Sequence, residues 1–372
     1  MPLRFACVVG ARPNFMKMAP IIRALESEAL DGKAAVTLIH TGQHYDANLS
    51  DVFFVELGMR TPDISLEVGS GTHAVQTARI LERMERVLLE GPPSGGAYDC
   101  IVVVGDVNST MAATLAAAKL GIRIAHVEAG LRSFDRTMPE EINRIVTDSI
   151  ADLLLVSEPA GVDNLIHEGH SSDSIKLVGN VMIDTLYQMI PQANELSLAE
   201  QLGLLPRQYG VITIHRPSNV DEHETLTALI DVLIEISSDI PFVFPAHPRT
   251  RDALERAGLR TRMEKAANIR LLDPLGYLRF LSLTSKARVI VTDSGGLQEE
   301  STALGIPCLT LRSNTERPIT VEEGTSTLVG NDAKKLRTCL HDVLDGRYKS
   351  GTCPALWDGH AAERIAELLV NG

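Results

Sequence analysis

Short apolar runs alternate along the first half of the chain with longer stretches in which apolar residues recur at helical spacing. The runs occupy residues 4–9, 35–40, 100–104, 122–127, 152–157 and 175–178. The stretches between them include MKMAPIIRALESEAL and HAVQTARILERMERVLLE, whose pattern predicts amphipathic helices. Because continuous apolar runs are typical of strands buried on both faces of a parallel sheet, the first half predicts a doubly wound α/β domain.

The second half repeats this pattern and predicts a second domain of the same class. Its apolar runs occupy residues 210–214, 241–247, 268–273, 287–293 and 306–311. The chain has 372 residues, which is enough for two hydrophobic cores. We place the N-terminal domain at 1–182 and the C-terminal domain at 183–357, with a linker in the region 181–207. A final helix in 358–372 can pack on either domain, including the N-terminal one.

Composition narrows the class of protein and its partners. The chain is 44% hydrophobic and 22% charged, and 35 basic against 48 acidic residues give a formal charge of −13. Such an acidic surface repels polyanions, which argues against nucleic acid and anionic membranes as partners. A phosphorylated substrate would therefore need a local basic site.

The cysteines and the lengths of the apolar runs indicate the cellular compartment of the protein. The five cysteines form no Cys-x-x-Cys pair, so neither a disulfide framework nor a thiolate zinc site is indicated. No apolar run reaches the length of a signal peptide's hydrophobic region or of a transmembrane helix. We therefore expect a cytoplasmic protein.

Polar residues follow the first two predicted strands. Gly10 allows a tight turn at the first strand end, and Arg12 and Lys17 add positive charge at the helix that follows. These features predict a phosphate site at the carboxyl edge of the sheet, although a solvated pair of surface cations explains them equally well. The polar loop 41–46 is, taken alone, better explained as turn chemistry. No GxGxxG fingerprint is present, so NAD is not indicated.

Carboxylates follow two further strands of the first half. Asp106 ends the run CIVVVGD, Glu128 ends the run IRIAHVE, and Glu140 and Glu141 follow Pro139. Asp106, Glu128 and Glu140 can converge on one site, where close carboxylates raise one another's pKa and suit acid and base chemistry near neutral pH. The alternatives are a helix N-cap for Asp106 and an ordinary first-turn acid for one of the two glutamates.

The second half places histidines and a glycine turn at its strand ends. His215 and His247 each lie beside an arginine at a strand end, and their spacing matches no metal motif. The segment Ser294-Gly295-Gly296 joins a strand to a helix and predicts a phosphate cradle, because glycine lets the backbone approach an anion. The alternative interpretation of this segment is an ordinary tight turn between a strand and a helix. Further along, Glu300 can accept hydrogen bonds from ribose hydroxyls, and Arg317 offers another cation.

Ten segments spread over nearly the whole chain occur in one order. They read GARPNFMKMAP, TGQHYD, VVGDVNST, HVEAGLRSFD, MPEEINR, TIHRPSNV, FPAHPRT, PLGYLRFL, DSGGLQEES and NTERP. Together they resemble the non-hydrolysing UDP-N-acetylglucosamine 2-epimerase family. The resemblance implies a GT-B-like fold of two Rossmann-like domains with an interdomain cleft, a homodimer, and no metal or nicotinamide cofactor. It also implies an isomerase that removes the C2 proton, expels UDP from C1 to leave 2-acetamidoglucal, and then reverses both steps with inversion at C2.

Site residues are carried over from the resemblance by motif. The catalytic set is Asp106, Glu128, Glu140 and His215, with Asp106 and Glu140 as the acid and base and His215 stabilising charge on the departing phosphate. The expected UDP contacts, with Phe280 at the uracil, are Arg12, Lys17, Phe280, Ser294, Gly295, Gly296, Glu300 and Arg317. Candidates for a second site or for the cleft are Gln43, His44 and His247. The N-terminal domain would then carry the acid and base carboxylates and the C-terminal domain would bind UDP.

Two regions depart from the family pattern. Residues 133–144 form a shorter segment, and residues 45–46 and 70–74 differ from the loop pattern tied to allosteric activation by a second substrate molecule. Regulation and the exact sugar therefore stay open. The alternatives are a hydrolysing 2-epimerase, an epimerase of a related UDP-2-acetamido sugar, a GT-B glycosyltransferase and a non-catalytic UDP-sugar-binding protein.

Overall fold

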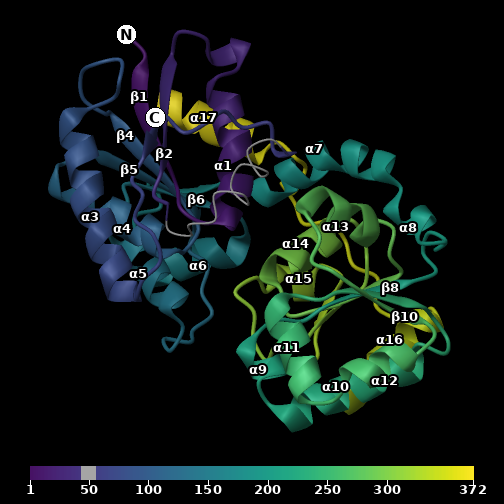
Figure 1. The fold of residues 1–372 in the computed structure, drawn as a ribbon. Coiled ribbons are helices and arrows are strands. Elements are labelled where there is room, and N and C mark those ends of the chain that lie inside the picture. Colours follow the sequence, from purple (N-terminus) through teal and green to yellow (C-terminus); the bar gives the residue numbers. More distant parts are fainter. Residues whose placement is uncertain (43–55) are drawn as a thin grey trace. The chain divides into compact units, whose positions relative to one another are not determined.

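A computed structural model describes residues 1–42 and 56–372. The chain divides into two compact units (Figure 1). Unit 1 comprises Met1–Thr185 and Ala355–Gly372, and unit 2 comprises Leu186–Pro354. None of the helices in the described part of the chain is both long and apolar enough to cross a membrane.

Unit 1 is built on a parallel sheet with strand order β3-β2-β1-β4-β5-β6-β7. Its strands are β1 (Leu3–Val9), β2 (Ala34–His40), β3 (Ile64–Ser65), β4 (Cys100–Val104), β5 (Arg123–Ala129), β6 (Leu153–Val156) and β7 (Ile175–Leu177). Its helices are α1 (Arg12–Leu25), the short 3-10 helix η1 (Glu28–Leu30), α3 (His73–Glu90), α4 (Asn108–Lys119), α5 (Pro139–Ile150), α6 (Pro159–His167) and α17 (Ala361–Asn371). The order reverses between β1 and β4, as in the doubly wound Rossmann topology.

Alternate residues of these strands enter different layers. Ala6 and Val8 of β1 join Ile101 and Val103 of β4 in one cluster, which the apolar face of α3 and the alanine-rich α4 complete. Figure 1 shows α3, α4 and α5 on one side of this sheet and α1 with α17 on the other. Since side chains alternate across a strand, a run that is apolar throughout serves both layers.

The end of the chain is fastened to unit 1. Helix α17 packs against α1, and the buried Trp357 donates its indole N–H to the carbonyl of Ser157 at 3.1 Å. The carboxylate of Asp184 accepts the backbone N–H of Ala361 at 3.2 Å and of Ala362 at 2.7 Å. These groups begin α17, so a carboxylate there satisfies helix donors that otherwise lack partners.

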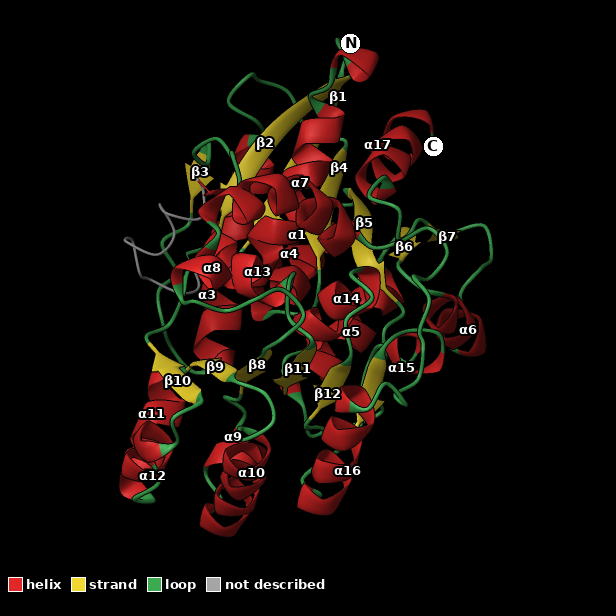
Figure 2. Ribbon diagram, turned by 90° about the vertical axis from the view of Figure 1, so that its right-hand side faces the viewer, coloured by secondary structure: helices red, strands yellow, loops and turns green. Residues whose placement is uncertain are grey.

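Unit 2 repeats the topology of unit 1. Its parallel sheet has the order β10-β9-β8-β11-β12-β13 and reverses between β8 and β11 (Figure 2). Its strands are β8 (Gly210–Thr213), β9 (Phe242–Pro245), β10 (Ile269–Leu272), β11 (Val289–Thr292), β12 (Cys308–Thr310) and β13 (Ser326–Leu328). Its helices are α8 (Leu198–Gln201), α9 (Pro217–Val220), α10 (His223–Ile236), α11 (Pro248–Arg256), α12 (Arg260–Lys265), α13 (Tyr277–Thr284), α14 (Gly295–Ala303), α15 (Ile319–Glu322) and α16 (Ala333–Leu344).

The two faces of the second sheet also bury alternate residues. Val289 and Val291 of β11 lie in a cluster formed with α10, α11 and α16. Ile290, between them, lies in the opposite cluster with residues of α8, α13 and α14. Helix α7 (Val181–Leu196) leads from unit 1 into unit 2 and contains Pro191 in its interior. Part of the region expected to be a linker is therefore helical.

Candidate functional site

The candidate residues of each unit gather where its strand order reverses. At such a switch point the helices after the two central strands leave on opposite faces, and the carboxyl ends of the strands stay open to a ligand. In unit 1 this point lies at the ends of β1 and β4, and in unit 2 at the ends of β8 and β11. Gly10 and Asp106 follow β1 and β4, and His215 and Ser294 follow β8 and β11. Glu128 and His247 belong to the ends of the adjacent strands β5 and β9.

The turn after β1 packs tightly against the start of α4. A Cβ on Gly10 would lie 2.1 Å from Ser109 Oγ, so this position excludes any larger residue. Asn14 Oδ1 accepts the N–H of Ala11 at 3.0 Å, and Asn14 Nδ2 donates to the carbonyl of Val104 at 2.8 Å. Helix α1 begins at Arg12, and its second turn brings Lys17 to the same edge of the sheet.

Three side chains converge on Gly105 at the end of β4. A Cβ there would lie 3.5 Å from each of Asn14 Nδ2, Lys17 Nζ and Glu128 Oε2. Lys17 and Glu128 form a buried ion pair. The predicted phosphate cation and one predicted catalytic carboxylate are therefore direct partners.

Glu128 adopts a backbone conformation that is rare for residues other than glycine. Its φ is 71°, and the register of β5 against β6 shifts between Val127 and Ala129. Such a bulge re-aims a side chain at a strand end. A non-glycine residue held in this region stores about 1–3 kcal/mol of strain, a feature that clusters at functional sites.

A buried network of hydrogen bonds and ion pairs holds the backbone on either side of this bulge. Asp148 of α5 lies 2.6 Å from His126 Nδ1, accepts the N–H of Gly130 at 3.0 Å and pairs with Arg132 at 2.7 Å. Nε2 of His126 lies 2.9 Å from the carbonyl oxygen of Gly105. Burial alone raises the pKa of Asp148, but His126 and Arg132 outweigh it and hold that pKa below its ordinary value. Through His126 and Asp148, the network connects Gly105, which precedes Asp106, and Gly130, which lies two residues after Glu128, to helix α5.

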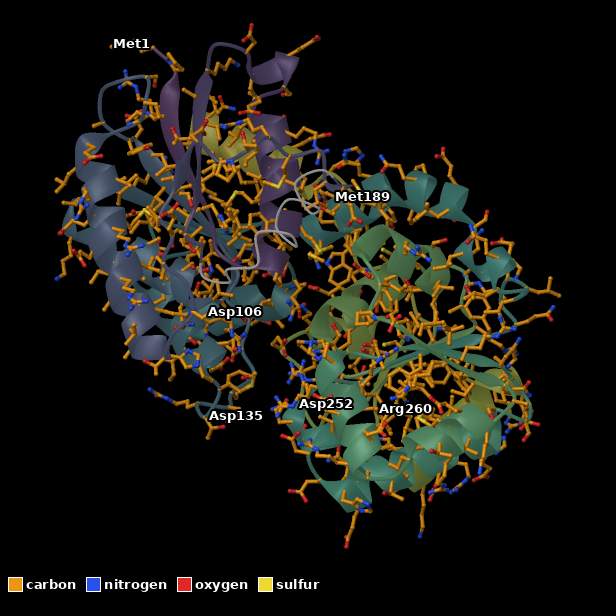
Figure 3. The ribbon with its side chains drawn as sticks, viewed as in Figure 1. Met1, Asp106, Asp135, Met189, Asp252 and Arg260 are labelled. Carbon is orange, nitrogen blue, oxygen red and sulfur yellow. The ribbon has the colours of Figure 1, made fainter. Side chains whose placement is uncertain are left out.

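Asp106, labelled in Figure 3, follows β4 by two positions, after Gly105. Its side chain is 33% exposed and pairs with Arg144 of α5, whose own side chain is 3% exposed. The N-cap of α4 is Val107 and no side chain caps that helix, so Asp106 does not have the alternative N-cap role. Asn143 adds a hydrogen bond from its amide to the Asp106 carbonyl at 2.8 Å.

The two glutamates after Pro139 have different surroundings. Glu141 is buried, accepts the N–H groups of Ser133 and Phe134 at 2.9 Å each, and pairs with Arg144 at 2.5 Å. Burial raises the Glu141 pKa, but these donors hold it below its ordinary value. Glu140 is half-buried, and no described residue forms an ion pair with it. Glu141 therefore has the structural role that one of the two was expected to have.

Asp293 organises the switch point of unit 2. Its fully buried carboxylate accepts the backbone N–H groups of His215 at 2.9 Å and Arg216 at 2.8 Å, and the Asn219 amide at 2.9 Å. Its other oxygen lies 3.0 Å from Nδ1 of His215. Burial raises the Asp293 pKa, but His215, Arg216 and Asn219 outweigh it and hold the pKa below its ordinary value. The carboxylate thus fixes the imidazole with Nε2 directed away from it.

The two predicted histidines lie together. The ring centroids of His215 and His247 are 6.0 Å apart. Nδ1 of His247 accepts the N–H of Arg249 at 3.2 Å, which caps α11 and leaves the ring hydrogen on Nε2. Burial, and then the nearby His215 and Arg249, lower the pKa of His247. The two histidines lie together because they follow β8 and β9, which are neighbours in the sheet.

The Ser-Gly-Gly turn begins α14, as predicted. Ser294 is its N-cap residue and makes no side-chain cap, so the first N–H groups of the helix keep their capacity for an anion. A Cβ on Gly296 would meet nothing within 4 Å, whereas one on Gly295 would lie 3.1 Å from Glu316 Oε1 and 3.4 Å from Arg317 Nη1. Gly296 thus faces open space, and Gly295 faces a buried ion cluster.

That ion cluster holds Arg317 close to the helix start. Arg317 pairs with Glu299 at 2.5 Å and with Glu316 at 2.8 Å, and Glu316 also pairs with Arg312 at 2.6 Å. Burial raises the pKa of Glu316, but Arg317 and Arg312 outweigh it and keep the pKa far below its ordinary value. Two cations and the positive end of α14 therefore share one region.

Glu300 and Phe280 lie on neighbouring helices of the same face. Glu300 is buried in the second turn of α14, and its Oε1 accepts the hydroxyl of Tyr277 at 2.9 Å. Phe280 of α13 is half-buried against the cluster that contains Leu283 and Leu297. Gln43 and His44, the remaining second-site candidates, lie outside the described residues.

A family model described as UDP-N-acetylglucosamine 2-epimerase matches residues 28–370. The chain belongs to this family. The UDP-N-acetylglucosamine 2-epimerase of Methanocaldococcus jannaschii is 40% identical over 375 residues, covering 100% of each protein. The UDP-2,3-diacetamido-2,3-dideoxy-D-glucuronate 2-epimerase of Pseudomonas aeruginosa is 38% identical over 380 residues, covering 99% of this chain and 100% of that protein.

Solved structures resemble the epimerase over its whole length. The M. jannaschii enzyme in complex with UDP-GlcNAc and UDP has a TM-score of 0.85 at 40% identity, with 100% of both chains covered. The Neisseria meningitidis enzyme bound to UDP-GlcNAc has a TM-score of 0.86 at 27% identity, again over 100% of both chains. The predicted family, the isomerase class and the GT-B-like fold class with its two Rossmann-like sheets are confirmed.

Several residues of the epimerase that shape the site were not singled out from the sequence. They are Arg144, Asp148, Asp293, Arg312 and Glu316. Asp293 had a local signal, since it ends an apolar strand directly before the glycine turn. Arg144 follows Glu141 at a helical i,i+3 spacing, which is also a signal for pairing. Arg312 and Glu316 pair at a spacing of four outside a helix, and Asp148 acts through His126 and Arg132, which lie farther away in the sequence.

No group of three or more His, Cys, Asp or Glu side chains within residues 1–42 and 56–372 is arranged to hold a metal ion. At both switch points, the acidic side chains instead pair with cations or with backbone N–H groups. The roles of the predicted site residues stay predictions.

Proposed function

We propose that this epimerase interconverts UDP-N-acetylglucosamine and UDP-N-acetylmannosamine and so supplies a precursor of cell-surface polysaccharide. One observation carries the proposal: the motif-matched carboxylates Asp106 and Glu128 follow or end the neighbouring strands β4 and β5, and from a strained bulge the Glu128 side chain reaches Gly105, next to Asp106. The names of the relatives support the substrate, since the M. jannaschii structure contains UDP-GlcNAc and UDP.

The reaction needs one proton transfer and one bond cleavage in each direction. A carboxylate takes the proton from C2, the electrons of that C–H bond form the C1=C2 double bond, and the C1–O bond breaks to release UDP. A second group, protonated as a carboxylic acid, then gives its proton to the opposite face of C2 and becomes a carboxylate, while UDP adds back to C1. We assign the proton transfers to Asp106 and Glu140, since two faces require two differently placed groups.

The ion pairs give the carboxylates of unit 1 defined positions. Arg144 holds Asp106, and Lys17 holds Glu128 in its strained conformation. Lys17 can also bind a phosphate oxygen when the ligand is present, because a lysine ammonium has three donors. Positioning of this kind is a large part of enzymatic rate enhancement.

Unit 2 carries, in this proposal, the binding of the leaving group. The start of α14 and Arg317 hold the negative charge that UDP gains when the C1–O bond breaks. His215 donates from Nε2 to a phosphate oxygen, because Asp293 occupies its Nδ1. Glu300 accepts from ribose hydroxyls and Phe280 packs on uracil.

Product analysis with purified enzyme tests the proposal. UDP-N-acetylglucosamine and UDP-2,3-diacetamido-2,3-dideoxy-glucuronate are supplied separately, and the products are followed by anion-exchange chromatography and proton NMR. We expect a UDP-linked manno product from UDP-N-acetylglucosamine without an equivalent amount of free UDP. Stoichiometric UDP would indicate a hydrolysing enzyme, and turnover of only the glucuronate would assign the substrate of the P. aeruginosa relative.

A further inference from the structure

The stretch 70–74 departs from the family pattern. It places a histidine beside the loop that carries Asp106 in unit 1. His73 is the first residue of α3 and is exposed. Its ring contacts Asn108, the first residue of α4, which follows Asp106 by two positions. The cap of α3 does not involve this ring, since Thr72 Oγ1 accepts the N–H of Val75 at 3.3 Å.

A chain of amide hydrogen bonds fixes the orientation of Asn108. Asn143 Nδ2 donates to the carbonyl of Asp106 at 2.8 Å and to Asn108 Oδ1 at 3.3 Å. Asn108 Nδ2 then donates to Gln76 Oε1 at 3.0 Å, and Gln76 Nε2 donates to the carbonyl of Gly69 at 3.4 Å. Asn108 and Gln76 each use the amide nitrogen as donor and the amide oxygen as acceptor, so flipping either one alone breaks these bonds.

This orientation favours one tautomer of His73. Asn108 Nδ2 lies 3.1 Å from His73 Nδ1, and with the amide nitrogen as donor, Nδ1 is the acceptor of that bond. The contact of Nδ1 with Asn108 Oδ1 is longer, at 3.3 Å, and that oxygen already accepts from Asn143. The imidazole therefore carries its hydrogen on Nε2, and no residue in the described ranges accepts it.

We propose that His73 is a sugar-binding residue that donates its Nε2 hydrogen to an oxygen on the sugar of the bound nucleotide sugar. The inference rests on the proposed function, in which the reacting sugar carbon lies at Asp106. The ring is linked through Asn108 and Asn143 to the backbone carbonyl of Asp106, and for this reason we assign its partner to the sugar rather than to uracil or ribose. The chain of amides preorganises the donor, which lowers the entropy lost on binding.

Two substitutions at His73 separate this role from a structural one. His73→Leu removes the donor, whereas His73→Gln can place an amide N–H near the position of Nε2. We expect the leucine variant to bind UDP-N-acetylglucosamine roughly tenfold more weakly, the loss of one good hydrogen bond. Affinity for UDP alone should stay unchanged, and the glutamine variant should recover most of the loss. Titration calorimetry with both ligands gives these values, and His167→Leu, an exposed histidine of α6, is the matched control.

The outcomes distinguish the inference from the proposed function. An equal loss for UDP and UDP-N-acetylglucosamine, or no loss for either, overturns the role of His73. A loss confined to the sugar nucleotide in an enzyme that proves unable to epimerise it supports His73 while contradicting the reaction. If wild type binds UDP-2,3-diacetamido-2,3-dideoxy-glucuronate instead, the same comparison is made with that ligand, and an unchanged affinity in His73→Leu again overturns the role.

Discussion

The switch point of unit 1 presents carboxylates that cations support, whereas the switch point of unit 2 presents imidazoles, a guanidinium and helix N–H groups that carboxylates support. In unit 1, Lys17 and Arg144 lie against Glu128 and Asp106. In unit 2, Asp293 lies beneath His215, and Glu316 holds Arg317. One topology thus carries two sites of opposite character.

This difference shows what the shared Rossmann topology leaves to the side chains. The strand order places the loops, but the sign of charge at each edge follows from which partners lie underneath. A buried ion pair contributes little net stability. Here each pair fixes the position of the charged side chain at the strand end. In the proposed function, proton transfer belongs to unit 1 and most of the phosphate binding to unit 2, and substitutions can test each role separately.

The largest effect is expected from removing the charge of an acid in unit 1. Asp106→Asn should lower the epimerisation rate by roughly a thousandfold, because one acid or base group is lost. The affinity for UDP should change less than about twofold, since most of the proposed UDP contacts lie in unit 2 and Asp106 pairs with Arg144, not with Lys17. NMR assays and calorimetry measure the two quantities.

Asp173→Asn, an exposed aspartate elsewhere in unit 1, is the control and should behave as wild type. Unchanged turnover in Asp106→Asn would remove this residue from the catalytic set. An equal loss of turnover and of UDP affinity would contradict the separation of the two edges.

A smaller effect, on stability, is expected from the buried acid of unit 2. The Asp293 pKa is lowered in the folded protein, so its charge contributes stability at neutral pH that is lost as the pH falls below about 4. Asp293→Asn should lower the free energy of unfolding at pH 7 by about 1–3 kcal/mol, and the difference from wild type should shrink below pH 4. Urea unfolding followed by circular dichroism at both pH values measures this, with the exposed Asp239→Asn as control. A difference that is independent of pH would mean that the Asp293 charge is not what stabilises the His215 loop.

The smallest effect is expected from adding one methyl group at the start of α14. Gly296→Ala should weaken UDP binding about tenfold, because its Cβ enters the open space that an anion would occupy. The fold should be unaffected or stabilised by up to about 1 kcal/mol, as alanine is the better helix former. Gly295→Ala, in contrast, should lower the melting temperature by disturbing Glu316 and Arg317. Unaltered UDP affinity in Gly296→Ala would remove the helix start from the UDP site.

The central strands of both sheets were predictable because each is apolar throughout. The run 100–104 matches β4, and 4–9 lies within β1. The edge strands β3 and β13, with two and three residues, were missed because such short segments leave no run of apolar residues. Pro191 lies in the interior of α7, because packing against neighbouring elements can outweigh the missing hydrogen bond of proline.

At the site, strand-end residues could be predicted but their partners could not. Asp106 and His215 follow apolar runs, which marks them as edge residues. Nothing in the sequence separates Glu140 from Glu141, because both follow Pro139 in the first turn of a helix. Only the contact of Glu141 with Ser133 and Phe134 assigns it the structural role.

Isotope exchange at C2 tests the central claim most directly. Wild-type enzyme is incubated with UDP-N-acetylglucosamine in deuterated water and followed by proton NMR. The account predicts that deuterium enters C2 of the UDP-linked manno product, and of recovered substrate, because a carboxylate removes that proton and solvent replaces it. A manno product that keeps its original C2 hydrogen would contradict the assignment of Asp106 and Glu140 as proton-transfer groups.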